Sequence, residues 1–152
     1  MDDKSIHIHA ADLGDPADAA AFVAVLVAYA ADPMGGGRPL AADARAALVP
    51  ALRAFPGASV LLARAAGAPV GVAVCFTGFS TFCPPPLTTL HDLAVVPAWR
   101  GRGIARRLRS EVRARARARG HCKVTLEVRD DNAAALALYR DLGFGAGESD
   151  GC

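Results

Sequence analysis

The feature that most constrains the fold is a short glycine loop between two different apolar runs. The loop is Arg100-Gly101-Arg102-Gly103. The run before it, Leu87 to Val96, is typical of a strand, and Pro97 ends it because proline cannot donate to a sheet ladder. The run after it, Arg102 to Arg119, carries apolar residues at helical spacing and is followed by Gly120. The sequence therefore predicts a strand-loop-helix unit with a tight turn.

A loop of this kind is a suitable anion site. The first N–H groups of a helix have no partners within the helix, so they can all point at a phosphate or pyrophosphate. Short Gly-Arg-Gly loops are also ordinary helix entries with arginines in water, and the loop alone leaves both interpretations open. It does not match the dinucleotide fingerprint, whose third glycine would fall at Arg106.

The remaining chain predicts one domain built around a mixed sheet. A length of 152 residues fits a single domain, residues 1–152. Periodicity and turn residues predict the order β-α-α-β-β-β-α-β-α. The elements are strand 5–10, helices 16–31 and 41–55, strands 58–65, 70–79 and 87–96, helix 102–119, strand 122–128 and helix 132–142. Hairpins early and crossover helices late indicate an α+β fold (α/β mixed sheet) rather than an all-parallel sheet.

Composition places the chain among soluble, cytoplasmic proteins. Hydrophobic residues make up 53% of the chain, yet no uninterrupted apolar run is long enough to cross a bilayer, so we expect no membrane association. Asp2 and Asp3 stand where a secretory signal carries a cationic segment. The cysteines show no Cys-x-x-Cys spacing, which predicts reduced thiols and no metal site. They are Cys75, Cys83, Cys122 and Cys152.

Separated segments of the chain resemble the motifs of the GNAT superfamily of N-acetyltransferases. They are Leu93-Ala94-Val95-Val96-Pro97, then Arg100-x-x-Gly103-x-Ala105, and then Asn132 with Tyr139 and Leu142-Gly143-Phe144. The resemblance covers most of residues 58–144, whereas residues 5–57 match only in element order, where the superfamily varies with acceptor. It implies a GNAT-like acyl-CoA N-acyltransferase fold with a cofactor core at about 87–144. It also implies acetyl transfer from acetyl-CoA to a primary amine by direct attack in a ternary complex.

The resemblance assigns the cofactor contacts to the strand-loop-helix unit. Backbone groups near Ala94 and Val95 would pair with the amides of pantetheine. The N–H groups of residues 101–106 would hold the pyrophosphate, with one or more arginines adding charge. Asn132 would hydrogen-bond the pantetheine arm, although Asp130-Asp131-Asn132 is also a good helix cap. The expected cofactor-binding residues are Leu93, Ala94, Val95, Arg100, Gly101, Arg102, Gly103, Ile104, Ala105, Arg106 and Asn132.

Three residues are candidates for proton transfer. Tyr139 lies two helical turns after Asn132, and the resemblance implies that it protonates the departing CoA thiolate; a packed tyrosine is the alternative. Glu127 matches the proton acceptor of ribosomal-protein alanine N-acetyltransferases, which the run Leu126 to Tyr139 resembles; an exposed strand carboxylate is the alternative. His91 stands where spermidine/spermine-type acetyltransferases have a glutamate, and a hydrogen-bonded strand histidine is the alternative.

The acceptor side is less constrained. Because side chains alternate along a strand, we expect His91 and Asp92 to face opposite sides, so that only one lines the acceptor cleft. The loops at 34–40 and 84–86 would shape this side. Aromatic and thiol side chains could contribute there or belong to the core; they are Phe76, Phe79, Phe82, Cys75 and Cys83. Small amines and protein N-termini both stay open as acceptors.

Two further features suggest other functions or partners. Nine arginines between residues 100 and 119 could form a nucleic-acid-binding module, but spacing of two residues spreads them around a helix, which favours a solvated surface. A catalytically inactive acetyl-CoA-binding protein is another alternative. Eight residues follow Phe144 in this chain, which predicts a truncated C-terminal strand region with an exposed sheet edge. Such an edge favours a homodimer or marginal stability.

Overall fold

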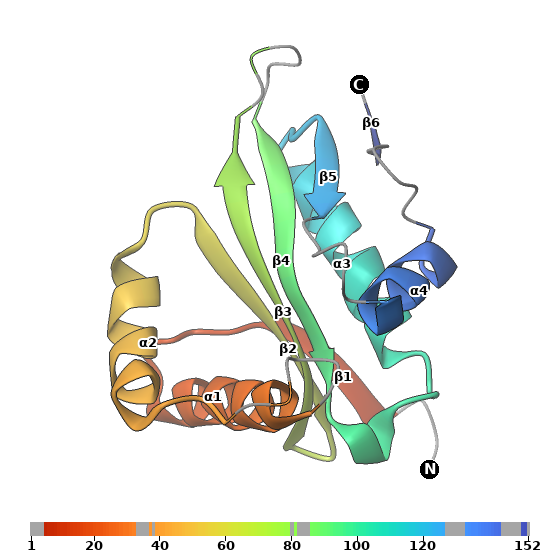
Figure 1. Cartoon of the computed structure of the whole chain (residues 1–152). Coiled ribbons are helices and arrows are strands. Elements are labelled where there is room, and N and C mark those ends of the chain that lie inside the picture. Colours follow the sequence, from red (N-terminus) through yellow and green to blue (C-terminus); the bar gives the residue numbers. More distant parts are fainter. Residues whose placement is uncertain are drawn as a thin grey trace.

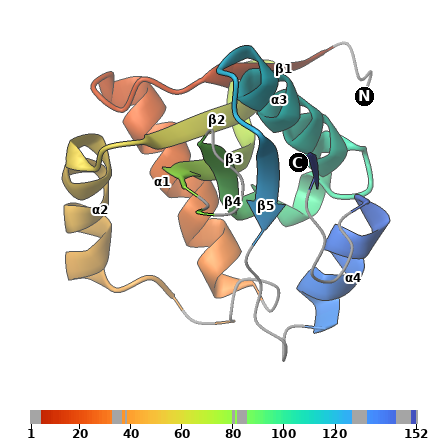
Figure 2. The same cartoon turned by 90° about the horizontal axis from the view of Figure 1, so that it is seen from above.

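A computed structural model describes residues 5–32, 37, 39–79, 81, 86–126, 133–143 and 150–151 of the chain. A twisted sheet forms the centre, with helices α1 and α2 on one face and helices α3 and α4 on the other (Figures 1 and 2). The elements are β1 (Ile6–Ala10), α1 (Pro16–Ala31), α2 (Ala42–Ala54), β2 (Ala58–Ala65), β3 (Ala68–Gly78), β4 (Leu87–Val95), the 3-10 turn η3 (Pro97–Trp99), α3 (Ile104–Ala118), β5 (Lys123–Leu126), α4 (Ala133–Asp141) and β6 (Asp150–Gly151). The predicted order and the mixed α+β class are confirmed.

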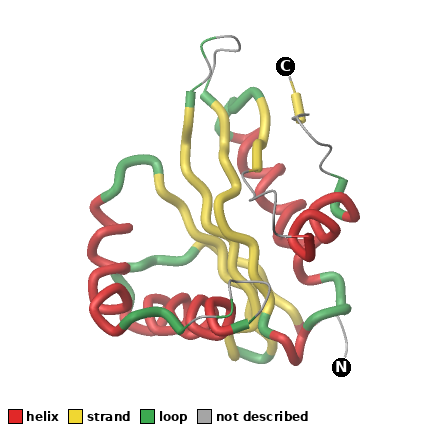
Figure 3. Tube along the Cα trace, in the orientation of Figure 1, coloured by secondary structure: helices red, strands yellow, loops and turns green. Residues whose placement is uncertain are grey.

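Within the described residues the strands form one sheet in the order β1-β2-β3-β4-β5-β6 (Figure 3). All neighbours are antiparallel except β4 and β5, which run parallel at Thr88–Leu90 and Val124–Leu126 and are connected through α3. At the far edge β6 pairs antiparallel with β5 at Lys123 and Val124. A short strand therefore covers part of the edge that the sequence predicted to be bare. Homodimerisation stays a prediction.

Hydrophobic residues fill both faces of the sheet. On the α3 face, Ile104, Leu108 and Val112 recur every four residues, so one stripe of the helix packs on the strands, as the sequence predicted. On the α1 face, the fully buried Phe22 packs with alternate residues of the central strands, such as Val72. The two layers fix the end of β4 between α1 and α3, beside the glycine loop.

Close packing of α3 on the sheet depends on Gly71 of β3. A Cβ at this position would lie 3.1 Å from Ile104 Cγ2 and 3.1 Å from Leu108 Cδ1. These distances are tighter than an ordinary van der Waals contact, so a side chain here would require the side chains of α3 to shift. The start of α3, and with it the glycine loop, is therefore held directly against the central strands.

Helix α1 begins where its sequence predicts. The side chain of Asp15 accepts a hydrogen bond from the backbone N–H of Ala17, and Pro16 occupies the first turn. Asp18 accepts from Arg64 of β2 at 2.9 Å and from the backbone of Asp12 at 2.9 Å. In the part of the chain that the structure describes, no helix combines the length and the apolar character needed to cross a membrane.

Candidate active site

A cavity of about 390 Å³ lies at the end of β4, beside the glycine loop. Its walls come from the last part of α1, from β4, from the turn and loop that follow β4, from the start of α3 and from the end of α4. The lining residues are Tyr29, Leu93, Ala94, Val95, Trp99, Arg100, Gly101, Gly103, Ile104, Ala105, Arg106, Asp141 and Leu142. Most of the cofactor-binding residues predicted from the sequence are therefore neighbours in space.

The glycine loop has the geometry of an anion cradle. Gly101 and Gly103 have φ angles of 76° and 78°, in the left-handed region that favours glycine. A Cβ at either position would meet no atom within 4 Å. Gly103 also precedes α3 without a side-chain cap, which leaves the first-turn N–H groups to a ligand. The open space and the donors fit the pyrophosphate of a CoA molecule.

The arginines around the loop contact the protein itself. Arg100 donates from Nε to the carbonyl oxygen of Val95 at 3.1 Å and from Nη1 to Asp32 at 3.2 Å. The guanidinium of Arg102 lies 4.7 Å from the centre of the Trp99 ring. Arg106 donates to the carbonyl oxygen of Asp141 at 3.2 Å. Contact of these three arginines with phosphate groups stays a prediction.

Tyr139 lies in the core on the α3 face. Its residue surface is 6% exposed, among buried residues that include Leu93 and Ile104. Burial raises the pKa of the Tyr139 phenol, and the nearby Tyr29 and Asp92 raise it further. The phenol is therefore neutral near pH 7 and carries its proton. Asn132, which was predicted to bind the cofactor, and Glu127, which was predicted to accept the proton of the amine, lie outside the described residues.

The expectation that His91 and Asp92 face opposite sides is wrong. Leu90 and Leu93 both pack in the core on the α3 face although they are three residues apart. A β-bulge causes this, because the register with β3 shifts between residues 90 and 92. Both residues between the leucines therefore face the α1 side, and His91 Nε2 comes within 3.9 Å of Asp92 Oδ2.

From the sequence, Asp92 was considered for the acceptor cleft but was not among the candidate catalytic residues. Burial raises the pKa of its carboxyl, and His91 lowers it in part. Burial likewise raises the pKa of Tyr29, and Asp92 adds to the effect. Asp92 therefore raises the pKa of both Tyr29 and Tyr139, and of these three residues Tyr29 lines the cavity. Tyr29 and Trp99 were also missed, although both are rare aromatic types here and Trp99 directly precedes the glycine loop.

The aromatic and thiol candidates separate clearly in space. The Phe76 ring contacts the His91 ring at 5.5 Å between centroids, on the α1 face of the sheet. Phe79 is 67% exposed. Cys75 is buried, and burial raises the pKa of its thiol to about 12, so the thiolate needed for acyl transfer is scarce near pH 7. Phe82 and Cys83 lie outside the described residues.

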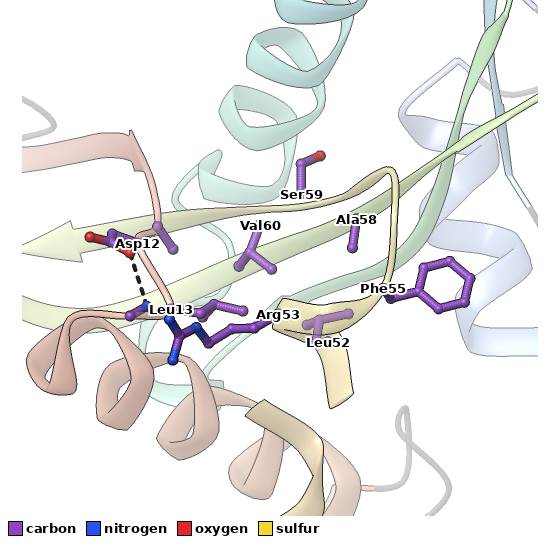
Figure 4. A pocket seen from close by; sticks show the side chains of 10 residues that line it. Asp12, Leu13, Leu52, Arg53, Phe55, Ala58, Ser59 and Val60 are labelled. Carbon is purple, nitrogen blue, oxygen red and sulfur yellow. Dashed lines mark hydrogen bonds between the residues drawn. The ribbon is translucent and has the colours of Figure 1, made fainter. Parts of the chain in front are cut away.

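A second cavity, of about 220 Å³, lies between the loop before α1, the end of α2 and the start of β2. In Figure 4 the Arg53 side chain extends toward Asp12 and Leu13, whereas the Phe55 ring points the other way. Asp12 Oδ1 accepts a hydrogen bond from the backbone N–H of Gly14 at 2.9 Å. This carboxylate helps to shape a turn, and the cavity shares no lining residue with the cavity beside the glycine loop.

The arginines along α3 point in several directions. Arg107 donates to the carbonyl oxygen of Ile6 in β1 at 3.2 Å, and Arg115 pairs with Glu111 on its own helix at 2.9 Å. With Arg106 turned toward α4, these side chains do not form one cationic stripe. This arrangement does not support a nucleic-acid-binding surface on the described part of α3.

Comparison with known proteins identifies the class of protein. Residues 25–144 match the model of the acetyltransferase (GNAT) family, and the chain belongs to this family. N-alpha-acetyltransferase RimI of Mycobacterium tuberculosis is 48% identical over 76 residues, which are 49% of this chain and 46% of that protein. The chain spans less than half the length of the first curated relatives that it matches.

Solved structures share the fold across nearly the whole chain. The aminoglycoside acetyltransferase meta-AAC0020 from an uncultured soil metagenomic sample, in complex with sisomicin, has a TM-score of 0.77 at 19% identity, covering 96% of this chain and 92% of that chain. Aminoglycoside N-acetyltransferase AAC(6')-Iy in complex with CoA has a TM-score of 0.72 at 19% identity, covering 93% and 88%. At these identities the likeness shows the fold alone.

Proposed function

We propose that this protein transfers an acetyl group from acetyl-CoA to a primary amine in a ternary complex. The observation that carries the proposal is the cavity at the end of β4, whose lining joins the glycine loop to the last residues of α4. Membership of the GNAT family and the match to RimI support the same reaction class. Bound acetyl-CoA would supply the acetyl group as an activated thioester.

Different residues of this chain would bind the cofactor, orient it and donate a proton. First-turn N–H groups at Gly103 and beyond would bind the pyrophosphate, and backbone groups at Ala94 would orient the pantetheine arm. The buried, neutral phenol of Tyr139 would deliver a proton to the departing CoA thiolate, which leaves as the free thiol. Gly103 and Ala94 line the cavity, and Tyr139 is buried in the core cluster that contains the lining residues Leu93 and Ile104.

The acceptor amine must lose a proton before it reacts, because an alkylammonium group is protonated near pH 7. His91 can take this proton, since its ring is half exposed on the acceptor side and lies 3.9 Å from Asp92. Glu127 and a chain of waters are the alternative proton acceptors. As acceptor we favour a peptide N-terminus, because RimI of Mycobacterium tuberculosis carries the name N-alpha-acetyltransferase.

Binding of acetyl-CoA can be tested apart from turnover. Acetyl-CoA at about 100 times its dissociation constant stabilises a protein by about 2.7 kcal/mol, which raises the melting temperature by several degrees. Product formation is then measured by mass spectrometry with short peptides and small amines as acceptors. No thermal shift would refute the cofactor site, and a shift without any acetylated product would favour the inactive acetyl-CoA-binding alternative.

A further inference from the structure

Three aromatic rings follow one another across the acceptor side of the sheet. Phe55, at the end of α2, meets Phe76 of β3 with ring centroids 5.3 Å apart and an interplanar angle of 80°. Phe76 meets His91 of β4 at 5.5 Å and 75°. Edge-to-face packing of this kind holds each ring in a fixed orientation. We call these three residues the acceptor shelf.

The shelf ends at a carboxylate beside the cavity. The β-bulge of β4 puts His91 and Asp92 on the same face, with 3.9 Å between Nε2 and Oδ2. Asp92 in turn precedes Leu93 and Ala94, which line the cavity. A molecule lying on the shelf therefore meets a carboxyl group at the end nearest the cavity.

Packing of the core does not account for the outer part of the shelf. Phe55 is 56% exposed, and the His91 side chain is 53% exposed. Large aromatic surface in water is unfavourable unless another group covers it. Residues that line only a core are buried, as Phe22 and Leu62 are on the same face of the sheet.

The charge and shape of this surface define its occupant. A single ammonium group suits Asp92, and an apolar or aromatic group beside that ammonium suits the exposed rings. A polycationic amino sugar would need several carboxylates, whereas the carboxylate that the described residues place beside a shelf ring is that of Asp92, 3.9 Å from His91 Nε2. Apolar amines, including peptide N-termini with a hydrophobic side chain close to the amine, are therefore favoured.

We propose that the acceptor shelf binds the apolar group beside the acceptor's amine, while Asp92 binds the ammonium group. The inference rests on the proposed acetyl transfer, because it names the substrate class of the same site. Phe55 and Phe76 then act as specificity-determining residues, and Asp92 positions the amine near His91 and Tyr139.

Calorimetry with two matched amines tests the shelf without requiring turnover. Phenethylamine and ethanolamine both carry a primary amine on a two-carbon chain, but only phenethylamine has an aromatic ring. In the CoA-saturated protein we expect phenethylamine to bind roughly tenfold more tightly than ethanolamine. Phe55→Ala reduces this ratio to about twofold or less, whereas Asp92→Asn weakens both amines by a similar factor.

Phe79→Ala is the matched control, because Phe79 is also exposed but makes none of the ring contacts among the described residues. In Phe79→Ala the affinity for phenethylamine relative to ethanolamine stays at the wild-type value. Three results would contradict the acceptor-shelf proposal. They are equal affinity of the two amines, an unchanged affinity ratio of phenethylamine to ethanolamine in Phe55→Ala, and tighter binding of sisomicin than of phenethylamine. Acetylation of any amine would still leave the proposed function standing, whereas failure to bind acetyl-CoA would remove the proposed function itself.

Discussion

Arg100 of the glycine loop and Asp32 at the end of α1 form an ion pair, with Nη1 3.2 Å from both carboxylate oxygens. Both side chains are more than half buried. The pair connects the predicted cofactor loop with the helix that carries Tyr29. Arg100 was expected beside the phosphates, and its contact with Asp32 gives it a role in positioning the loop.

A double-mutant cycle with Arg100→Met and Asp32→Asn measures this connection. We expect a coupling free energy of about 1 kcal/mol in urea unfolding, because a partly buried pair is worth more than an exposed one. Both variants also weaken acetyl-CoA binding. Arg115→Met breaks the more exposed pair with Glu111 and leaves that affinity unchanged. Additive stability effects, or normal acetyl-CoA affinity in Asp32→Asn, would argue against a positioning role.

Replacement of Gly103 by alanine separates backbone strain from ligand binding. Its φ of 78° makes an L-residue unfavourable, so we expect Gly103→Ala to lose about 1 kcal/mol of stability. Gly67→Ala is the matched control, because Gly67 has a φ of 88° in a hairpin turn and also has open space around its Cα.

Only Gly103→Ala places a methyl group at the wall of the cavity. Acetyl-CoA affinity, measured by calorimetry, therefore falls about tenfold in Gly103→Ala and stays normal in Gly67→Ala. Equal affinities in the two variants would show that the loop does not hold the cofactor.

Local sequence signals were enough for most of the fold. Helix α1 was predicted at its observed bounds because Asp15-Pro16 and Asp32-Pro33 mark its two ends. The stripe of Ile104, Leu108 and Val112 likewise identified the buried face of α3. These features depend on residues close together in the chain.

Features that arise from contacts between strands were missed. The β-bulge at His91 is set by pairing with β3, and strict alternation was assumed instead. The sequence signal of the β-bulge is that Leu90 and Leu93, three residues apart, are both apolar and pack in the same core. The grouping of Tyr29 with Asp92 depends on α1 lying over β4, which no local pattern reveals.

The raised pKa of Asp92 predicts an unusual dependence of stability on pH. Burial favours the neutral carboxyl, so the folded-state pKa lies above the ordinary value of 3.8. The wild type therefore loses stability as the pH rises through this pKa, whereas Asp92→Asn does not. We expect Asp92→Asn to be more stable than the wild type at pH 8, with a smaller difference at pH 5.

Urea unfolding at both pH values checks this expectation. Asp43→Asn, at an exposed position in the first turn of α2, controls for the loss of one negative charge. Asp92→Asn should also bind amines less tightly while the fold gains stability. A variant that is less stable than the wild type at pH 8 would mean that the Asp92 carboxylate stabilises the fold.

Acceptor-dependent release of free CoA, compared between the wild type and Tyr139→Phe, tests the central claim most directly. Phenylalanine keeps the buried ring but removes the proton donor, so melting temperatures of both proteins are compared alongside the rates. We predict that the wild type releases CoA in equal amount to the acetylated amine. In Tyr139→Phe, kcat falls at least about a hundredfold while the KM for acetyl-CoA changes by less than about threefold. An unchanged kcat in a folded Tyr139→Phe, or a wild type that releases CoA no faster with an amine than without one, would contradict the account.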